Sequence, residues 1–157
     1  MKVEEIMTKT VITCTPADAI QDVIKLMSEK NVSGIPVMDK DKLVGMVTEG
    51  DILKLLAVPK KSETLWLPSP LEVILEIPFR ELMQIRDLQN AYTDLGHKPV
   101  RDVMHKEVWT TTPEADIEDA AAEMVRRKVN RLPVVKAGQL VGIVTRDDII
   151  HGLGGRK

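Results

Sequence analysis

The chain has 157 residues, and its 22 lysines and arginines against 24 aspartates and glutamates leave a net charge of −2. That balance disfavours a nucleic-acid-binding protein, because such proteins bind phosphates through a basic surface. The single cysteine, Cys14, excludes an intramolecular disulfide, and the sequence shows neither a secretory leader nor an apolar run of membrane-spanning length, so we expect a cytoplasmic protein.

The sequence contains one unit twice. Residues 3–53 align with residues 100–150 without a gap, and 20 of the 51 aligned pairs are identical. A gap-free match of this length indicates a duplication with an insertion between the copies. We expect a first repeat over residues 1–56, a partly helical insertion over 57–99 and a second repeat over 100–157.

Each repeat begins with a predicted strand and a predicted helix. The β-branched stretches at 11–14 and 108–111 favour short strands. A Thr-Pro pair follows each stretch; threonine is a good N-cap, and proline is tolerated at the first helical position. Apolar residues then recur at the spacing of a buried helical face. The pairs are Thr15-Pro16 and Thr112-Pro113, and the apolar residues are Ile20, Val23, Ile24 and Met27 in the first repeat and Ile117, Ala120, Ala121, Met124 and Val125 in the second.

Two strands and a second helix complete each repeat. Residues 34–47 and 131–144 each hold two apolar stretches around a polar turn, a pattern typical of a β-hairpin. The predicted fold is α+β (mixed α/β), with two tandem βαββα repeats packed sheet to sheet about a pseudo-twofold axis. Such packing leaves clefts between the copies, and clefts of that kind are frequent ligand sites. The turns are expected at 39–42 and 136–139, and the final helices at about 49–56 and 146–153.

The insertion resembles neither repeat. Three prolines predict irregular structure over 57–70. Apolar residues take helical spacing from Leu71 onward, Pro78 should break or kink that helix, and Gly96 suits a position just past a helix end. An apolar segment that carries Trp66 would pack either on the chain's own core or on another subunit. A homodimer formed through the insertion is therefore one hypothesis.

The second hairpin strand of each repeat leads into one spacing, Gly-x-x-Thr-x-x-Asp. It reads GMVTEGD at 45–51 and GIVTRDD at 142–148. A threonine followed three residues later by an acid can form a capping box at a helix N-terminus. The same groups suit a nucleotide, because a carboxylate accepts hydrogen bonds from vicinal hydroxyls and a threonine hydroxyl with free helix N–H groups binds phosphate. Capping and ligand binding are compatible, and both interpretations stay open at this point.

The motifs of the two repeats occur in the same order and at one fixed offset, and they resemble those of the CBS (cystathionine-β-synthase-type) domain. The first repeat reads VEEIM, TVITCTP, GIPVM and LVGMVTEGDI, and the second reads VRDVM, EVWTTTP, RLPVV and LVGIVTRDDI. The resemblance covers about 100 of the 157 residues and leaves out the insertion. It implies a stand-alone CBS pair, or Bateman module, that binds an adenosine-containing ligand and regulates an unidentified partner protein. The candidate ligands are AMP, ADP and ATP, with NAD and S-adenosylmethionine as further candidates.

The resemblance also implies two sites, each combining strand residues of one repeat with the Thr/Asp helix entry of the other. Arg131 stands in site B where the first repeat has Gly34, and its forked donors fit phosphate. We therefore expect site B to bind the more phosphate-dependent ligand and site A to be weaker or empty. The alternatives are a solvated Arg131 and valines that belong to the core. Site A comprises Lys9, Val11, Val32, Ser33, Ile35, Ile143, Thr145 and Asp148, and site B comprises Lys106, Val108, Val129, Arg131, Leu132, Met46, Thr48 and Asp51.

The sequence shows no recognisable catalytic or metal-binding pattern. His97, His105 and His151 lack metal-ligand spacing, and Cys14 has no histidine close in sequence. We expect a non-enzymatic sensor without a required cofactor, for which an adenine nucleotide is a regulatory ligand. The main alternative is an oligomerisation scaffold with empty clefts that acts through residues 57–99. An enzyme acting on the bound nucleotide and a nucleic-acid-binding protein are less favoured alternatives.

Overall fold

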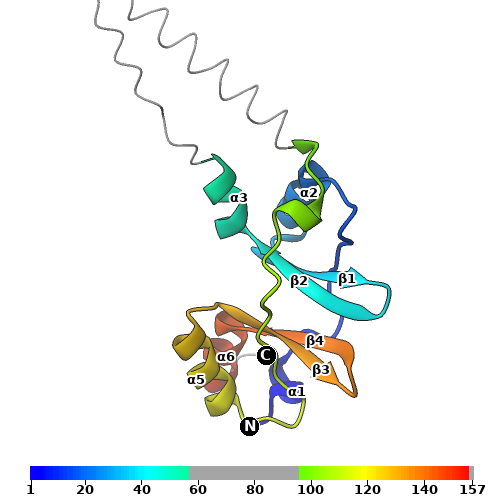
Figure 1. Cartoon of the computed structure of the whole chain (residues 1–157). Helices are drawn as coiled ribbons and strands as arrows, with labels where there is room; N and C mark the ends of the chain where they lie inside the picture. Colours follow the sequence, from blue (N-terminus) through cyan, green and yellow to red (C-terminus); the bar gives the residue numbers. More distant parts are fainter. Residues whose placement is uncertain (57–95, 156–157) are drawn as a thin grey trace, which may run out of the picture.

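A computed structural model describes residues 1–56 and 96–155 (Figure 1). Each repeat holds a short amino-terminal helix, a longer helix, an antiparallel hairpin and a final helix. In the first repeat these are α1 (Val3–Ile6), α2 (Ile20–Lys30), β1 (Gly34–Asp39), β2 (Lys42–Thr48) and α3 (Glu49–Leu56). In the second they are the 3-10 turn η1 (Val100–Asp102), α5 (Ile117–Arg127), β3 (Arg131–Lys136), β4 (Gln139–Thr145) and α6 (Arg146–Leu153).

The two hairpins have the same register and lie against each other through β2 and β4. In Figure 1 the helices α2 and α3 lie beside the first hairpin, and α5 and α6 lie beside the second. Both predicted turns and both final helices are confirmed. In the second turn Ala137 and Gly138 have φ values of 50° and 79°, as a two-residue turn matching the strand twist requires.

The strands predicted at 11–14 and 108–111 are shorter than expected. Each is reduced to one residue that forms a parallel bridge with the neighbouring hairpin: Cys14 with Val37, and Thr111 with Val134. The backbone N–H of Cys14 donates to the Pro36 carbonyl at 3.1 Å, and the Cys14 carbonyl accepts from Met38 at 2.8 Å. The pairing stops there because the following Thr-Pro pair opens a turn.

The expected N-caps Thr15 and Thr112 are wrong. The helices α2 and α5 begin four residues after the prolines, and their N-cap residues are Ala19 and Asp116. Thr15 instead forms a turn, in which its N–H donates to Asp18 Oδ2 at 2.7 Å and its carbonyl accepts from the Asp18 N–H at 3.2 Å.

Neither new N-cap side chain caps its helix; the first N–H of α2 and of α5 is instead bound by the segment that leads into the other repeat. The N–H of Ile20 donates to the Lys98 carbonyl at 2.9 Å, and the N–H of Ile117 donates to the Met1 carbonyl at 3.2 Å. Buried backbone N–H groups need hydrogen-bond acceptors. Here the acceptors are carbonyls of the segment that leads into the other repeat.

The same leading segments complete both hydrophobic cores. Val100, from the second repeat, is fully buried in the core of the first, among Ile20, Val23 and Ile35. Val3, from the first repeat, is fully buried in the core of the second. Each repeat therefore contributes one valine side chain to the hydrophobic core of the other.

The expected buried helical faces are mostly present. In α2 the residues Ile20, Val23 and Met27 are buried, and in α5 Ile117, Ala120 and Met124 are buried. Val125 is the exception: its side chain is 79% exposed because its position on α5 turns away from the second core. Within the expected insertion, residues 57–95 lie outside the described residues; Gly96, expected just past a helix end, is itself helical and the turn follows at His97.

The glycine that opens each Gly-x-x-Thr-x-x-Asp motif sits where the other repeat's leading segment crosses it. A Cβ on Gly45 would lie 2.7 Å from Met104 Sδ and 3.0 Å from the His105 carbonyl oxygen. A Cβ on Gly142 would meet Met7 Sδ and the Thr8 carbonyl oxygen in the same way, at 2.5 and 3.2 Å. Glycine is required at both positions for close backbone approach.

We predict that Gly45→Ala lowers the free energy of unfolding by about 1–3 kcal/mol, the usual cost of overpacking. His105 cannot withdraw easily, because it exchanges two backbone hydrogen bonds of 3.0 Å with Met46. Urea unfolding measures the effect. Gly50→Ala is the matched control, since a Cβ there meets only Thr48 Oγ1 at 3.6 Å. Equal stability of the Gly45 variant and the parent protein would contradict the close approach.

The thiol of Cys14 should be unreactive in the folded protein. Burial, and secondarily the Asp18 carboxylate, raise the pKa of Cys14 to about 12, and the residue is 6% exposed. Alkylation needs the thiolate, which is scarce well below that pKa. We expect no labelling by iodoacetamide at pH 8 in buffer and full labelling in urea, measured by mass spectrometry. Rapid labelling of the folded protein would contradict this.

Candidate functional site

A cleft of about 350 Å³ lies between the two repeats, and we call it cleft B. It gathers six of the eight residues expected in site B. Three come from the first repeat and three from the second, which is the cross-repeat arrangement that the resemblance implied. They are Met46, Thr48 and Asp51, and Val108, Val129 and Arg131.

The other two expected residues of site B lie elsewhere. Leu132 is fully buried in the core of the second repeat. Side chains alternate along a strand, so Leu132 points away from the cleft that its neighbour Arg131 lines. Lys106 is exposed and does not line cleft B.

The residues expected in site A are spread over several surroundings. Ile35 is fully buried in the first core, for the same reason as Leu132. Lys9 is exposed, Val11 is half-buried, and Val32 and Ser33 line a groove beside α2 and α3. Ile143 exchanges backbone hydrogen bonds with Thr8, while Thr145 and Asp148 contact each other at the start of α6.

Both Thr/Asp pairs form capping boxes. Asp148 Oδ2 accepts from the Thr145 N–H at 2.8 Å and from Thr145 Oγ1 at 2.7 Å, while the Asp148 N–H donates to Thr145 Oγ1 at 3.2 Å. The three contacts of Asp51 with Thr48 are the same, at 2.9, 2.8 and 3.3 Å. The capping interpretation of the motif is thus confirmed, and each carboxylate keeps its second oxygen outside these contacts.

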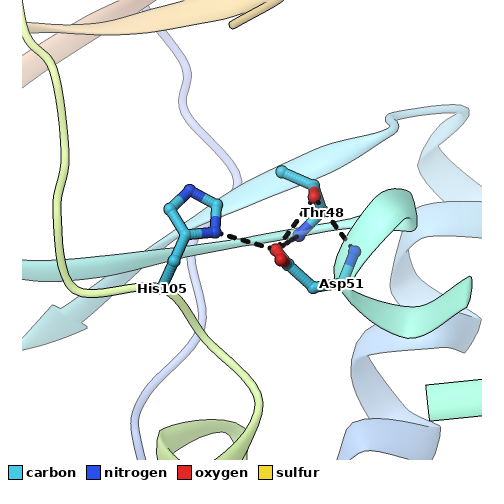
Figure 2. Close-up of polar contacts among 3 residues, drawn as sticks. All are labelled: Thr48, Asp51 and His105. Atoms are coloured by element: carbon cyan, nitrogen blue, oxygen red, sulfur yellow. Dashed lines mark hydrogen bonds and ion pairs between the residues drawn. The ribbon is translucent and has the colours of Figure 1, made fainter. Parts of the chain in front are cut away.

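His105 is a residue of the cleft that the sequence-based analysis missed. Its Nδ1 lies 2.9 Å from Asp51 Oδ2, so a histidine of the second repeat contacts the acid of the first (Figure 2). The Asp51 side chain is 11% exposed and that of His105 is 41% exposed. The aligned residue in the first repeat is Thr8. A titratable side chain present in only one of the two copies was the sequence signal that could have identified His105.

Arg131 reaches across from β3 to the first repeat. Its Nη2 donates to Ser33 Oγ at 2.7 Å, and its guanidinium fills the space that a Cβ on Gly34 would need. Burial lowers the pKa of Arg131, and Arg146 lowers it further while Glu49 raises it. Within residues 1–56 and 96–155, no carboxylate forms a salt bridge with Arg131. A desolvated cation held by a neutral hydroxyl is suited to an anionic ligand.

Further side chains of the cleft were not predicted either. Trp109 lines it, next to the expected Val108, and the guanidinium of Arg127 stacks 3.4 Å from the Trp109 ring centroid. Lys54 and Lys128 add positive charge, while Glu49 and Glu107 add negative charge. In the first repeat Ile12 aligns with Trp109, so the aromatic wall belongs to cleft B alone.

Among residues 1–56 and 96–155, no three His, Cys, Asp or Glu side chains gather closely enough to hold a metal ion. Over the same residues, no helix is both long and apolar enough to cross a membrane.

Comparisons with known proteins agree with this architecture. The CBS domain profile matches residues 3–58 and 100–155. The protein MJ1426 of Methanocaldococcus jannaschii is 40% identical over 155 residues, which cover 98% of this chain and 91% of that protein.

Two solved structures share the fold. CBSX2 in complex with AMP has a TM-score of 0.69 at 27% identity, covering 98% of this chain and 96% of that chain. The CBS domain pair of MJ0100 in complex with 5′-methylthioadenosine and S-adenosyl-L-methionine has a TM-score of 0.71 at 26% identity, covering 100% and 98%. With the profile matching both repeats, the chain belongs to the CBS domain family, and its two repeats form a CBS domain pair.

Proposed function

We propose that this protein is a non-catalytic sensor that binds an adenosine-containing ligand in cleft B. The observation that carries the proposal is Arg131, a half-buried cation that forms no salt bridge with a described carboxylate, in the same cleft as the Thr48–Asp51 pair. The AMP complex of CBSX2 and the 5′-methylthioadenosine and S-adenosylmethionine complex of MJ0100 support the ligand class. AMP, ADP and ATP are the first candidates, and NAD and S-adenosylmethionine follow.

The walls of cleft B suit the three parts of such a ligand. Met46, Val108 and Val129 offer apolar surface to the adenine ring. The second oxygen of Asp51 is available to a ribose hydroxyl, and the guanidinium of Arg131 suits phosphate. Because the walls come from both repeats, occupancy would favour the packing of the repeats that binds the ligand better. That packing is what a regulated partner protein would sense.

The two sites should differ. Cleft B is lined by Arg131, Trp109 and Lys54. The aligned positions in the other repeat, which would serve site A, carry Gly34, Ile12 and His151. We therefore propose that site A binds more weakly or stays empty. The homodimer and the cytoplasmic location remain predictions. The alternative, an oligomerisation scaffold acting through residues 57–99, also remains a prediction, because residues 57–95 lie outside the described residues.

Removing Asp51 should weaken nucleotide binding more than removing Asp148. In a Trp66→Phe background Trp109 is the only tryptophan in the sequence, so its fluorescence reports on cleft B. We expect Asp51→Ala to weaken AMP binding about 10-fold or more, the usual effect of losing a hydrogen bond to a charged group. Asp148→Ala is the matched control, because it removes an equivalent capping box. Loss of the Trp109 signal only in Asp148→Ala would contradict the proposal.

Removing the charge of Arg131 should separate phosphate from nucleoside recognition. We expect Arg131→Gln to weaken AMP binding about 10- to 100-fold, since a charge-assisted hydrogen bond is lost, and to change adenosine binding about threefold at most. Isothermal calorimetry with both ligands measures this. Arg126→Gln is the control, because Arg126 is exposed and pairs with Glu123. An equal loss for AMP and adenosine would mean that Arg131 has only a structural role.

A further inference from the structure

A second cavity adjoins cleft B on the side of the helices α5 and α6. It is a groove of about 850 Å³, and we call it groove C. Cleft B and groove C share five lining residues, which are Ser33 and the stretch Lys128–Arg131. Arg131 therefore lies at the boundary of the two cavities. A ligand that places one phosphate against Arg131 in cleft B can place the next phosphate in groove C.

The strand register brings a second arginine next to Arg131. Arg131 is paired with Thr145 in the β3–β4 hairpin, and the N–H of Arg146 donates to the Asn130 carbonyl at 3.0 Å. Both arginine side chains line groove C. Burial is the main cause that lowers the pKa of Arg131, and the charge of Arg146 lowers it further, while Glu49 opposes the shift. The two guanidinium groups are thus close enough to repel each other.

Lys128 adds a third positive charge to the same groove. Within residues 1–56 and 96–155, no salt bridge involves Lys128, Arg131 or Arg146. Asp147 also lines groove C, and its carboxylate contacts His151 at 3.4 Å. Neighbouring cations that are not neutralised by carboxylates repel one another, and binding of a polyanion relieves that repulsion.

The first repeat shows that the fold does not require these three cations. The backbone is alike in both repeats: α2 and α5 end at residues with φ values of 52° and 56°, and the two hairpins have the same register. The groove beside α2 and α3 has no lysine or arginine among its described lining residues. The second repeat therefore gathers cations where the first has none. The aligned pairs are Asn31 and Lys128, Gly34 and Arg131, and Glu49 and Arg146.

Lysine is also an unfavourable residue for the end of α5. Lys128 is the C-cap of this helix and has the left-handed backbone conformation, which asparagine adopts more readily than lysine. The first repeat has Asn31 at the aligned C-cap. The helix end itself does not need a lysine, so the charge of its side chain is the feature that distinguishes this position.

We infer that Arg146 and Lys128 extend cleft B into a polyphosphate site, so that the protein binds ADP and ATP in preference to AMP. Arg131 then binds the α-phosphate, and Arg146 with Lys128 binds the β-phosphate at the edge of groove C. A guanidinium can donate two parallel hydrogen bonds to one phosphate, so a second phosphate matches the second arginine. Arg146 is thereby a specificity-determining residue. This inference rests on the proposed function, because it presupposes an adenine nucleotide in cleft B.

The test compares ADP with AMP by Trp109 fluorescence in the Trp66→Phe protein, with EDTA and at one fixed salt concentration, since salt screens these charges. ADP should bind about 10-fold or more tightly than AMP, the effect of gaining a charge-assisted hydrogen bond. In Arg146→Gln the ratio of the two dissociation constants should fall to about threefold or less, because only the contact with the β-phosphate is lost. The dissociation constant for AMP should stay within about threefold of the parent value.

Two further variants separate the role of Arg146 from general charge and from folding. Arg126→Gln is the matched control for the loss of one positive charge, because Arg126 pairs with Glu123 and lines neither cavity; it should leave the ratio unchanged. Lys128→Asn introduces the residue that the first repeat has at this position. It should reduce the preference for ADP without lowering the free energy of unfolding, whereas a purely structural lysine would give the opposite result.

Each outcome has a separate meaning. If the parent protein binds neither nucleotide, the proposed function fails. If it binds AMP and ADP with equal affinity, the proposed function stands and the polyphosphate site is overturned. A preference for ADP that persists unchanged in Arg146→Gln overturns the role of Arg146.

A measurement on the protein without substitutions covers the case in which a variant fails to fold. In nitrogen-15 NMR of the arginine side chains, ADP should shift the Nε–H signal of Arg146 clearly more than AMP does. Both nucleotides should shift the signal of Arg131. An Arg146 signal that does not respond to ADP would overturn the inference.

Discussion

The exchange of leading segments between the repeats determines most of this structure. Val100 completes the first core and Val3 completes the second, and the carbonyls of Lys98 and Met1 bind the first N–H groups of α2 and α5. Burying a valine side chain contributes about 1.5–3 kcal/mol, so each exchange is a substantial part of a marginal stability. The crossing segments also carry Met104 and His105 over β2, which is why the motif there opens with Gly45.

The same exchange builds the candidate site. His105 pairs with Met46 through the backbone, and this pairing brings its ring to Asp51. Arg131 crosses in the opposite direction and fits because its aligned partner is Gly34. The duplication supplies two copies of each contributing segment, and at aligned positions cleft B has Arg131, Trp109 and His105 where the first repeat has Gly34, Ile12 and Thr8. The asymmetry of charge and aromatic surface in cleft B follows from those few positions.

Local patterns were sufficient for the elements that depend on local contacts. The hairpin turns and the helices α3 and α6 were predicted from sequence because turn residues, apolar spacing and the Thr/Asp box act within a few positions. Thr15 was a wrong N-cap because it forms a turn with Asp18, and α2 begins only at Ile20, whose N–H is bound by the Lys98 carbonyl, far away in the sequence. His105 was missed for the same reason: its role depends on a cross-repeat pairing, and Leu132 was misplaced because one strand step reverses its direction.

The mutual burial of Val3 and Val100 has a consequence for ancestry. A chain with a single repeat would have a core lacking one valine and a helix lacking a partner for its first N–H. It could satisfy both by exchanging its leading segment with a second identical chain. The tandem pair is equivalent to a segment-swapped dimer whose two chains are joined into one polypeptide. Joining the two halves removes the concentration dependence of that association and allows aligned positions of the two halves to differ.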